Sequence, residues 1–180
     1  MPGEERREVF GSYGFKLLVY QVPRSGRWSI RSFHARGWRI INLRRRSTWN
    51  QAISNLLAKQ AQRWTRLPGD PELPPPTEIP PAALLSQLEY LAQQTAHEDH
   101  DLRDVPHLRL GYEQDLQGAT YWPACLAKAC DYLGLPSAPL PREPGIIRMY
   151  DDPPEVLIPN HQELVDAVAR SPYSHLLEHV

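Results

Sequence analysis

Residues 67 to 81, LPGDPELPPPTEIPP, contain seven prolines and restrict the fold of this chain more than any other segment. Proline lacks a backbone N–H and clashes with a preceding helical turn, so the segment excludes both a helix and a central strand. We expect an extended connector, partly in the polyproline conformation. The flanking segments are each too small to bury a core alone, so we interpret the connector as a surface excursion within one domain spanning residues 1 to 180.

Charge is divided unevenly along the chain. The net charge is −1, but residues 1 to 66 carry fourteen Lys and Arg against three Glu, whereas residues 67 to 180 carry six against eighteen acidic residues. This asymmetry suits an anionic ligand held by the first half, and it equally suits packing of one half on the other. The arginines of the first half lack interleaved aromatic residues, which argues against a nucleic-acid surface.

The cellular location is predicted from two absences in the sequence. No run approaches the roughly 18 apolar residues of a membrane span, and the first ten residues, MPGEERREVF, hold no apolar stretch typical of a signal peptide. We therefore expect a cytoplasmic protein without a membrane partner. Cys125 and Cys130 lie five residues apart on a predicted helix and point to different faces, which predicts two buried free thiols rather than a disulfide or a metal site.

The first half of the sequence predicts a parallel βαβ unit. Two apolar runs rich in β-formers, residues 15 to 22 and 38 to 43, have the length of buried strands, and residues 28 to 36 between them can form a short helix. Such a crossover favours parallel strands. Ser47 is a predicted N-cap for a helix that runs from residue 48 to about residue 66.

The second half predicts further alternation of helices and a strand. The expected elements are a helix over residues 82 to 101, a strand over 107 to 112, a helix over 120 to 133 closed by Gly134, and a helix over 161 to 169 capped by Asn160. The first of these helices ends in HEDHD, residues 97 to 101. We interpret this run as solvated, because a closed metal site needs more ligands than a frayed helix end usually presents.

The segment IINLRRRSTWNQAIS, residues 40 to 54, is the most informative for function. Its predicted strand delivers Arg46 to the strand's carboxyl end, and Ser54 follows eight residues later on the next helix. Ligands of open α/β sheets sit beyond the carboxyl ends of the strands, where arginines and a helix N-terminus can bind phosphate. A solvated turn is the alternative for three consecutive arginines.

This segment resembles the 3′-phosphate-binding segment of sulfotransferases that use 3′-phosphoadenosine-5′-phosphosulfate (PAPS), in which an Arg and a Ser lie eight positions apart. Three more segments are similar to parts of that family and occur in the family's order. They are GFKLLVYQ at residues 14 to 21, LGYEQDLQGATYWPACLAKACDYLGLP at 110 to 136, and PPEVLIPNHQELVDAVARSPYSHLL at 153 to 177. Together the four segments cover most of the chain outside the proline-rich stretch.

The resemblance implies an α/β, P-loop-nucleotide-like fold with a parallel sheet flanked by helices. It also implies transfer of a sulfonate group from PAPS to a hydroxyl or amine of a small-molecule or glycan acceptor. Arg46 and Ser54 would then bind the 3′-phosphate of PAPS or of adenosine 3′,5′-bisphosphate. Tyr112 would contact the adenine, Arg148 is a candidate for a second phosphate contact, and Lys16 would reach the sulfonate.

Two departures from the family leave alternatives open. Leu18 stands where many members have a histidine that acts as general base, and His34 is the nearest alternative base along the sequence. The family's 5′-phosphosulfate loop has no counterpart before Gly14, so we expect a domain truncated at its N-terminus, unless the PRSG turn at residues 23 to 26 supplies Arg24 and Ser25 in its place. A second copy or a partner chain could complete the sheet. A non-catalytic module that keeps a 3′-phosphoadenosine half-site is the competing hypothesis.

Overall fold

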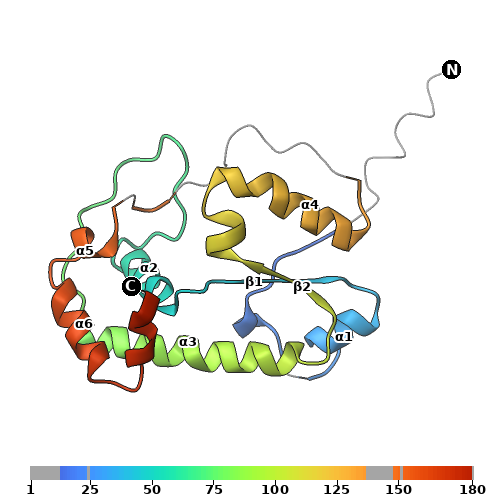
Figure 1. The fold of residues 1–180 in the computed structure, drawn as a ribbon, viewed down its shortest axis with the longest axis horizontal. Coiled ribbons are helices and arrows are strands. Elements are labelled where there is room, and N and C mark those ends of the chain that lie inside the picture. The colour runs from blue at the N-terminus through green and yellow to red at the C-terminus, as the bar shows by residue number, and fades with distance from the viewer. Residues whose placement is uncertain (1–12, 24, 137–147, 151, 180) are drawn as a thin grey trace.

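The protein has an α/β fold built around a small parallel sheet. The computed structural model describes residues 13–23, 25–136, 148–150 and 152–179. Strands β1 (Ile40–Arg44) and β2 (His107–Gly111) pair in parallel, with Ile40 opposite His107 and Arg44 opposite Gly111. The helices α2 (Thr48–Gln60) and α3 (Pro81–Leu102) make the long connection that a parallel pair requires (Figure 1). The predicted α/β class and a parallel sheet with helices are confirmed at this level, but the parallel pair is β1 with β2 and not residues 15 to 22 with residues 38 to 43.

The predicted strand over residues 15 to 22 is wrong. Residues 13 to 18 run without regular structure, and Val19–Gln21 form a turn of 3-10 helix, η1. β-forming side chains stabilise a strand only when they pack against cross-strand and same-face neighbours. Several large side chains of this segment lack that cover, since Leu17 is 40% exposed and Tyr20 is 62% exposed. Within the described residues the predicted βαβ unit is therefore not formed, although its helix exists as α1 (Ile30–Ala35).

The helix after β1 is capped as predicted but ends earlier than predicted. Ser47 Oγ accepts a hydrogen bond from the Asn50 N–H at 3.1 Å, which satisfies one of the free donors at the start of α2. The helix ends at Gln60 because Gln62 has a positive φ of 49°, a conformation that cannot continue a right-handed helix. The predicted end near residue 66 is therefore wrong by about two turns.

The proline-rich connector contains neither helix nor strand over residues 67 to 80, as predicted, and it is held to the core at its far end. The side chain of Gln60 hydrogen-bonds to the Thr77 N–H at 3.3 Å and to the carbonyls of Thr77 and Glu78. Ile79 is only 1% exposed and belongs to the hydrophobic core. Pro81 occupies the first turn of α3, where its missing N–H costs nothing.

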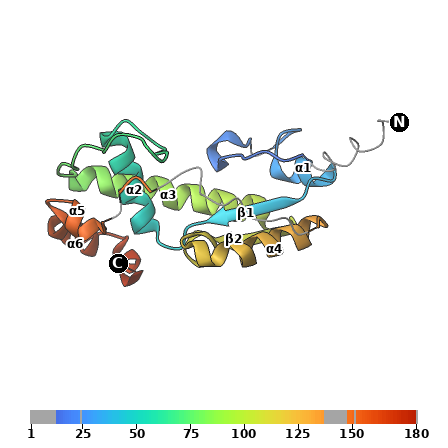
Figure 2. The same ribbon diagram turned by 90° about the horizontal axis from the view of Figure 1, so that it is seen from above.

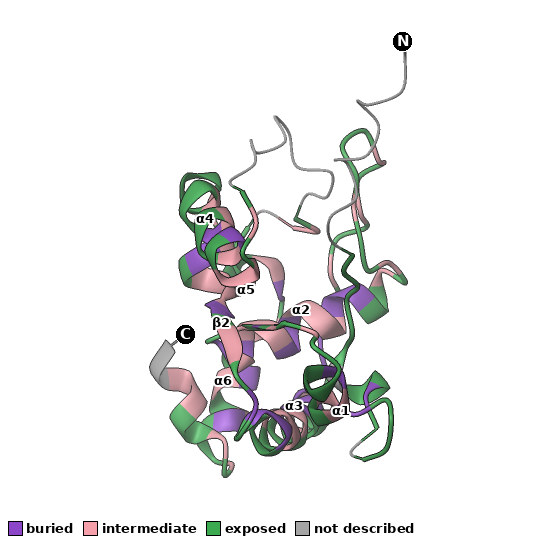
Figure 3. Ribbon diagram, turned by 90° about the vertical axis from the view of Figure 1, so that its right-hand side faces the viewer, coloured by how far each residue is buried: buried purple, intermediate pink, exposed green. Residues whose placement is uncertain are grey.

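The core lies where α2, α3 and α6 (His161–Ala169) meet, and the buried residues gather there (Figure 3). Its fully buried side chains come from the three helices and from the connector. They are Trp49, Ile53, Ile79, Leu84, Leu88, Leu164 and Val168. Asn160 occupies the N-cap position of α6, but its side chain makes no cap bond. It hydrogen-bonds instead to the backbone of Ile79, which corrects the predicted capping role.

The remaining elements follow β2 closely. They are η2 (Tyr112–Leu116), one π-helical turn, then η3 (Ala119–Tyr121), α4 (Trp122–Leu133), α5 (Pro154–Leu157), α6 and η4 (Ser174–His179). Gly134 closes α4 in the left-handed conformation with φ 69°, as predicted. Cys125 and Cys130 are buried and free. No helix in the described ranges is both long enough and apolar enough to cross a membrane.

Candidate functional site

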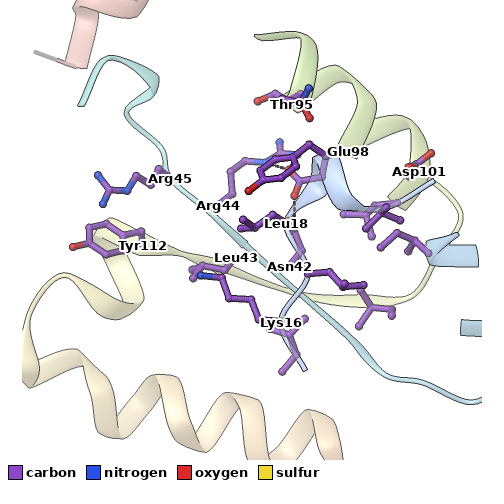
Figure 4. A pocket seen from close by; sticks show the side chains of 18 of the residues that line it. Lys16, Leu18, Asn42, Leu43, Arg44, Arg45, Thr95, Glu98, Asp101 and Tyr112 are labelled. Carbon is purple, nitrogen blue, oxygen red and sulfur yellow. Dashed lines mark hydrogen bonds and ion pairs between the residues drawn. The ribbon is translucent and has the colours of Figure 1, made fainter. Parts of the chain in front are cut away.

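The carboxyl ends of β1 and β2 bring a basic segment and an aromatic segment together. Because Arg44 is opposite Gly111 in the parallel register, the residues that follow both strands leave the sheet at the same end. The guanidinium carbon of Arg45 lies 4.2 Å from the centroid of the Tyr112 ring, which is cation–π geometry. Figure 4 shows these two side chains beside one another, at the end of β1 away from Asn42.

The corner between β2 and η2 is fixed by a buried carboxylate. Asp115 accepts a hydrogen bond from the Gly111 N–H at 2.8 Å and another from Lys128 Nζ of α4 at 2.6 Å. The hydrogen bond from Lys128 is the main cause that lowers the pKa of Asp115, and the Gly111 N–H adds to it. The carboxylate therefore stays charged at neutral pH and sets the direction in which Tyr112 and Glu113 leave the strand.

Glu113 occupies part of the N-terminus of α2, which corrects an expectation from the sequence. Its carboxylate accepts the Arg46 N–H at 2.7 Å and the Ser47 N–H at 3.4 Å. These donors lie where a helix N-terminus would otherwise hold an anionic ligand. The carboxylate of Glu113 therefore competes with any anion for the N–H groups just before α2, and arginine side chains gain importance for an anionic ligand. The sequence offered no signal for this role of Glu113 beyond its position directly after Tyr112.

A small cavity of about 250 Å³ opens beside these strand ends. Four arginines from both strands and the following turn contribute to its wall, which also includes Gln114 and contains no carboxylate. The lining residues are Arg44, Arg45, Arg46, Arg109, Leu110, Gly111 and Gln114. Within the described part of the chain, Arg45, Arg46 and Arg109 make no ion pair. The wall of the cavity is almost entirely apolar, so the arginines contribute mainly their aliphatic stems to it. The strand ends around it nevertheless carry three arginines without an ion-pair partner in the described residues.

Arg44 differs from its neighbours because acidic residues of α3 neutralise it. It donates to Glu98 at 2.7 and 3.0 Å and to Asp99 at 2.7 Å. Partial burial alone would lower the pKa of Arg44, but the hydrogen bonds to Asp99 and Glu98 outweigh it and raise that pKa. Arg44 thus joins β1 to α3 and leaves the other three arginines for a ligand.

The ends of the two parallel strands thus bring together a small cavity, three arginines without an ion-pair partner in the described residues, and the ring of Tyr112. Comparisons of the chain with protein-family models, curated proteins and solved structures found no match.

Two of the residues expected to bind the nucleotide lie at these strand ends. Arg46 lines the small cavity, and Tyr112 stacks with Arg45. Ser54, the expected partner of Arg46, is half-buried and lines neither this cavity nor the larger one described below. The face of α2 that meets the larger cavity carries Gln51 and Asn55, so Ser54 lies on a different side of the helix.

The other phosphate candidates lie elsewhere or outside the described residues. Arg148 is exposed and adjoins Met149, whose carbonyl accepts a hydrogen bond from Arg66 at 3.5 Å. It lines neither cavity. Ser25 is exposed in the turn before α1 and also lines neither cavity. Arg24 lies outside the described residues.

A second, much larger cavity of about 2030 Å³ separates residues 13 to 22 from β1, α2 and α3. Lys16 and Leu18 line it, and so do Arg45 and Tyr112, so it reaches the strand ends (Figure 4). His34, the alternative general base, is exposed on α1 and does not belong to its lining. The structure therefore places Lys16, but not His34, along a cavity that also contacts the aromatic ring.

The HEDHD run is solvated only in part, because Glu98 and Asp101 line this cavity whereas Asp99 and His100 are exposed as predicted. Glu98 accepts from Asn42 Nδ2 at 2.6 Å in addition to Arg44, and Asp101 is buried, with Oδ2 3.1 Å from His97 Nε2 (Figure 4). The correction has a physical reason. The polar alternate positions of β1 face α3 and supply partners to the acidic side chains. Among the residues that the structure describes, no three His, Cys, Asp or Glu side chains gather closely enough to hold a metal ion.

Proposed function

We propose that the chain binds an adenine nucleotide with a 3′-phosphate, such as adenosine 3′,5′-bisphosphate or PAPS, at the carboxyl ends of β1 and β2. The observation that carries this proposal is the contact of Arg45 with the Tyr112 ring at strand ends where three arginines have no ion-pair partner in the described residues. An aromatic ring stacks with a purine, and guanidinium groups bind phosphate through paired hydrogen bonds. The two requirements of such a nucleotide therefore meet at one end of the sheet.

The phosphate is assigned to Arg46 together with Arg109. Both arginines line the small cavity, whereas Ser54 does not. Arg109 lies on β2 opposite Asn42 and projects from the exposed side of its strand, since it is exposed while Leu110 next to it is buried. The strand ends thus provide two guanidinium groups from different strands, and Tyr112 contacts the base.

The fuller activity that we propose is sulfonate transfer from PAPS by a sulfotransferase-like, P-loop-nucleotide-like domain. A hydroxyl or amine of a small-molecule or glycan acceptor would form the new bond to sulfur, and adenosine 3′,5′-bisphosphate would leave. Such in-line transfer depends mainly on positioning and on stabilising charge at the bridging oxygen. Lys16 supports this proposal because it lines the cavity that also contacts Tyr112. Its ammonium group would stabilise the leaving phosphate.

Nucleotide binding without turnover is the second candidate function, and the position of the two base candidates favours it. Leu18 lines the large cavity but cannot accept a proton, and His34 lies outside the lining. Glu98, a carboxylate that does line it, is already held by Arg44 and Asn42. A chain of this kind would keep the nucleotide half-site and lack efficient proton removal from the acceptor.

Calorimetric titration with adenosine 3′,5′-bisphosphate tests the binding proposal. Arg46→Ala should weaken binding by about 1.5 to 3 kcal/mol, the range for a hydrogen bond to a charged group. Tyr112→Ala should weaken it by about 1 to 3 kcal/mol through lost stacking. Arg103→Ala, an exposed arginine that lines neither cavity, is the matched control and should bind like the parent. Absence of binding by the parent chain, or equal binding by all three variants, would refute the proposal.

A further inference from the structure

The β1 strand has one edge without a strand partner. It pairs with β2 alone in the two-stranded sheet, and all five of its residues line the large cavity. In Figure 2, residues 13 to 22, drawn in blue, lie on the side of β1 away from β2. In the described part of the chain, the N–H and C=O groups on this edge have no backbone partner. Such an edge is a template for pairing with another strand.

The apolar side of β1 is also uncovered. Ile41 and Leu43 are 38% and 49% exposed, whereas Asn42 between them is 6% exposed and bound to Glu98. The polar side of the strand therefore packs inward against α3 and the apolar side faces outward. This inverts the alternation expected of a strand with one solvated face.

The exposed apolar surface of the chain is concentrated at this cavity. Nine of the thirteen large hydrophobic side chains that are exposed in the described residues line it, so it is a site rather than scattered surface. The nine are Tyr13, Phe15, Leu17, Leu18, Tyr20, Ile41, Leu43, Trp64 and Tyr90. The volume of about 2030 Å³ exceeds the roughly 300 to 1,000 Å³ typical of small-molecule pockets. A segment of polypeptide fits these dimensions better than a small ligand does.

The charge of the cavity decides between two kinds of polypeptide. Arg36, Arg39 and Lys59 line it and make no ion pair within the described ranges. Both of its lining carboxylates already have partners, since Glu98 binds Arg44 and Asp101 lies 3.1 Å from His97 Nε2. A segment with acidic residues would complement this lining. The identical edge of a second copy would not.

Pairing through a two-fold axis runs β1 antiparallel to itself. With the axis at Asn42, Arg39 of each copy would lie opposite Arg45 of the other, and like charges directly opposite are destabilising. This argues against a second copy as the occupant and leaves a different polypeptide.

We infer that the free edge of β1 binds an extended segment of another polypeptide by strand addition. Its backbone would hydrogen-bond to the unpaired N–H and C=O groups of β1, and its alternate apolar side chains would enter the cavity over Ile41 and Leu43. Its acidic residues would face Arg39 and the other basic side chains of the lining that have no ion-pair partner in the described residues, Arg36 and Lys59. This inference concerns the edge and the apolar lining, so it does not depend on nucleotide binding at the strand ends.

A set of synthetic peptides tests the inference. The first is a strand of alternating valine and threonine with paired glutamates at both ends. The second carries lysines in place of the glutamates, and the third is the acidic peptide with alternate backbone nitrogens methylated along each edge in turn. Fluorescence anisotropy gives the dissociation constants. Hydrogen exchange of the amides of residues 40 to 44 reports whether the peptide pairs with β1.

The acidic peptide should bind and protect the amides of β1. The lysine peptide should bind at least about tenfold more weakly, and methylation of one edge should abolish protection while methylation of the other leaves it unchanged. Leu43→Glu, an exposed position that should not disturb folding, should weaken the acidic peptide, and Arg39→Glu should reverse the preference toward the lysine peptide. Failure of every peptide to bind, or equal affinity of the acidic, lysine and methylated peptides, would overturn the inference.

Discussion

Replacing Asn160 by alanine should destabilise the fold more than its half-exposed position suggests. Asn160 Oδ1 accepts the Ile79 N–H at 3.0 Å, and Asn160 Nδ2 donates to the Ile79 carbonyl at 2.9 Å. Ile79 is 1% exposed, so both backbone groups would lose their partner in an environment that water does not reach easily. An orphaned buried polar group costs about 1 to 3 kcal/mol, and two such groups with partial relaxation cost about 2 to 4 kcal/mol.

Urea denaturation followed by circular dichroism measures this loss. The midpoint should fall by about 1 to 2 M with an unchanged slope, for a slope of about 2 kcal/mol per molar urea, the middle of the usual range. Glu163→Ala is the matched control. It removes only the exposed contact that Asn160 Nδ2 makes with Glu163 at 2.9 Å and leaves both bonds to Ile79 intact. A loss below about 0.5 kcal/mol for Asn160→Ala, the ordinary range for a surface substitution, would refute the reasoning.

Three further predictions concern the strand ends and the chemistry. The folded-state pKa of Asp115 lies below its unfolded value, so the stabilisation from Asp115 is present above about pH 4 and is lost as the pH falls through the folded pKa. Asp115→Asn should therefore lower the free energy of unfolding at pH 7 and have little effect on it at pH 2. An equal loss at both pH values in urea denaturation would contradict this prediction. Glu113→Gln removes a negative charge near the arginines of the strand ends. The variant should therefore bind adenosine 3′,5′-bisphosphate about threefold more tightly at low ionic strength. Weaker binding by the variant in calorimetry would count against the proposed site. Sulfonate transfer from radiolabelled PAPS to hydroxyl and amine acceptors should be slow or absent, because a missing general base costs about 10²- to 10⁴-fold in rate; rapid turnover would show that another group replaces the base.

Elements with their own local signals were predictable from the sequence. Helix α2 begins where Ser47 supplies a cap, and α4 ends where Gly134 adopts a left-handed conformation. The absence of a strand over residues 15 to 22 could not be predicted from local signals. A strand forms only where a neighbouring strand edge pairs with it, and the sequence of one segment does not contain that information. The apolar run that indicates a buried strand over residues 15 to 22 forms part of the exposed wall of the large cavity instead.

Some residues of the candidate site could be predicted from local signals, and others depend on packing. The sequence placed Arg46 and Tyr112 after two strands, and parallel pairing brought both to one end of the sheet. Ser54 was not placed correctly by its eight-residue spacing, since the rotation of α2 is set by Trp49 and Ile53 in the core. Packing decides which side of a helix meets a cavity, and spacing alone does not contain that information.

Acidic residues far along the chain change what the basic segment can bind. Arg44, Arg45 and Arg46 are consecutive, yet Glu98 and Asp99 neutralise the first, and Glu113 accepts the backbone N–H of the third. Part of the unequal charge of the two halves therefore serves to hold them together through ion pairs. This is the second interpretation of the charge asymmetry, packing of one half on the other. What remains for an anion is the side chains of Arg45, Arg46 and Arg109, because these alone among the cavity's arginines lack a carboxylate partner in the described residues. Specificity for a nucleotide over a bare phosphate must then come from Tyr112, the aromatic ring in contact with this cluster at Arg45.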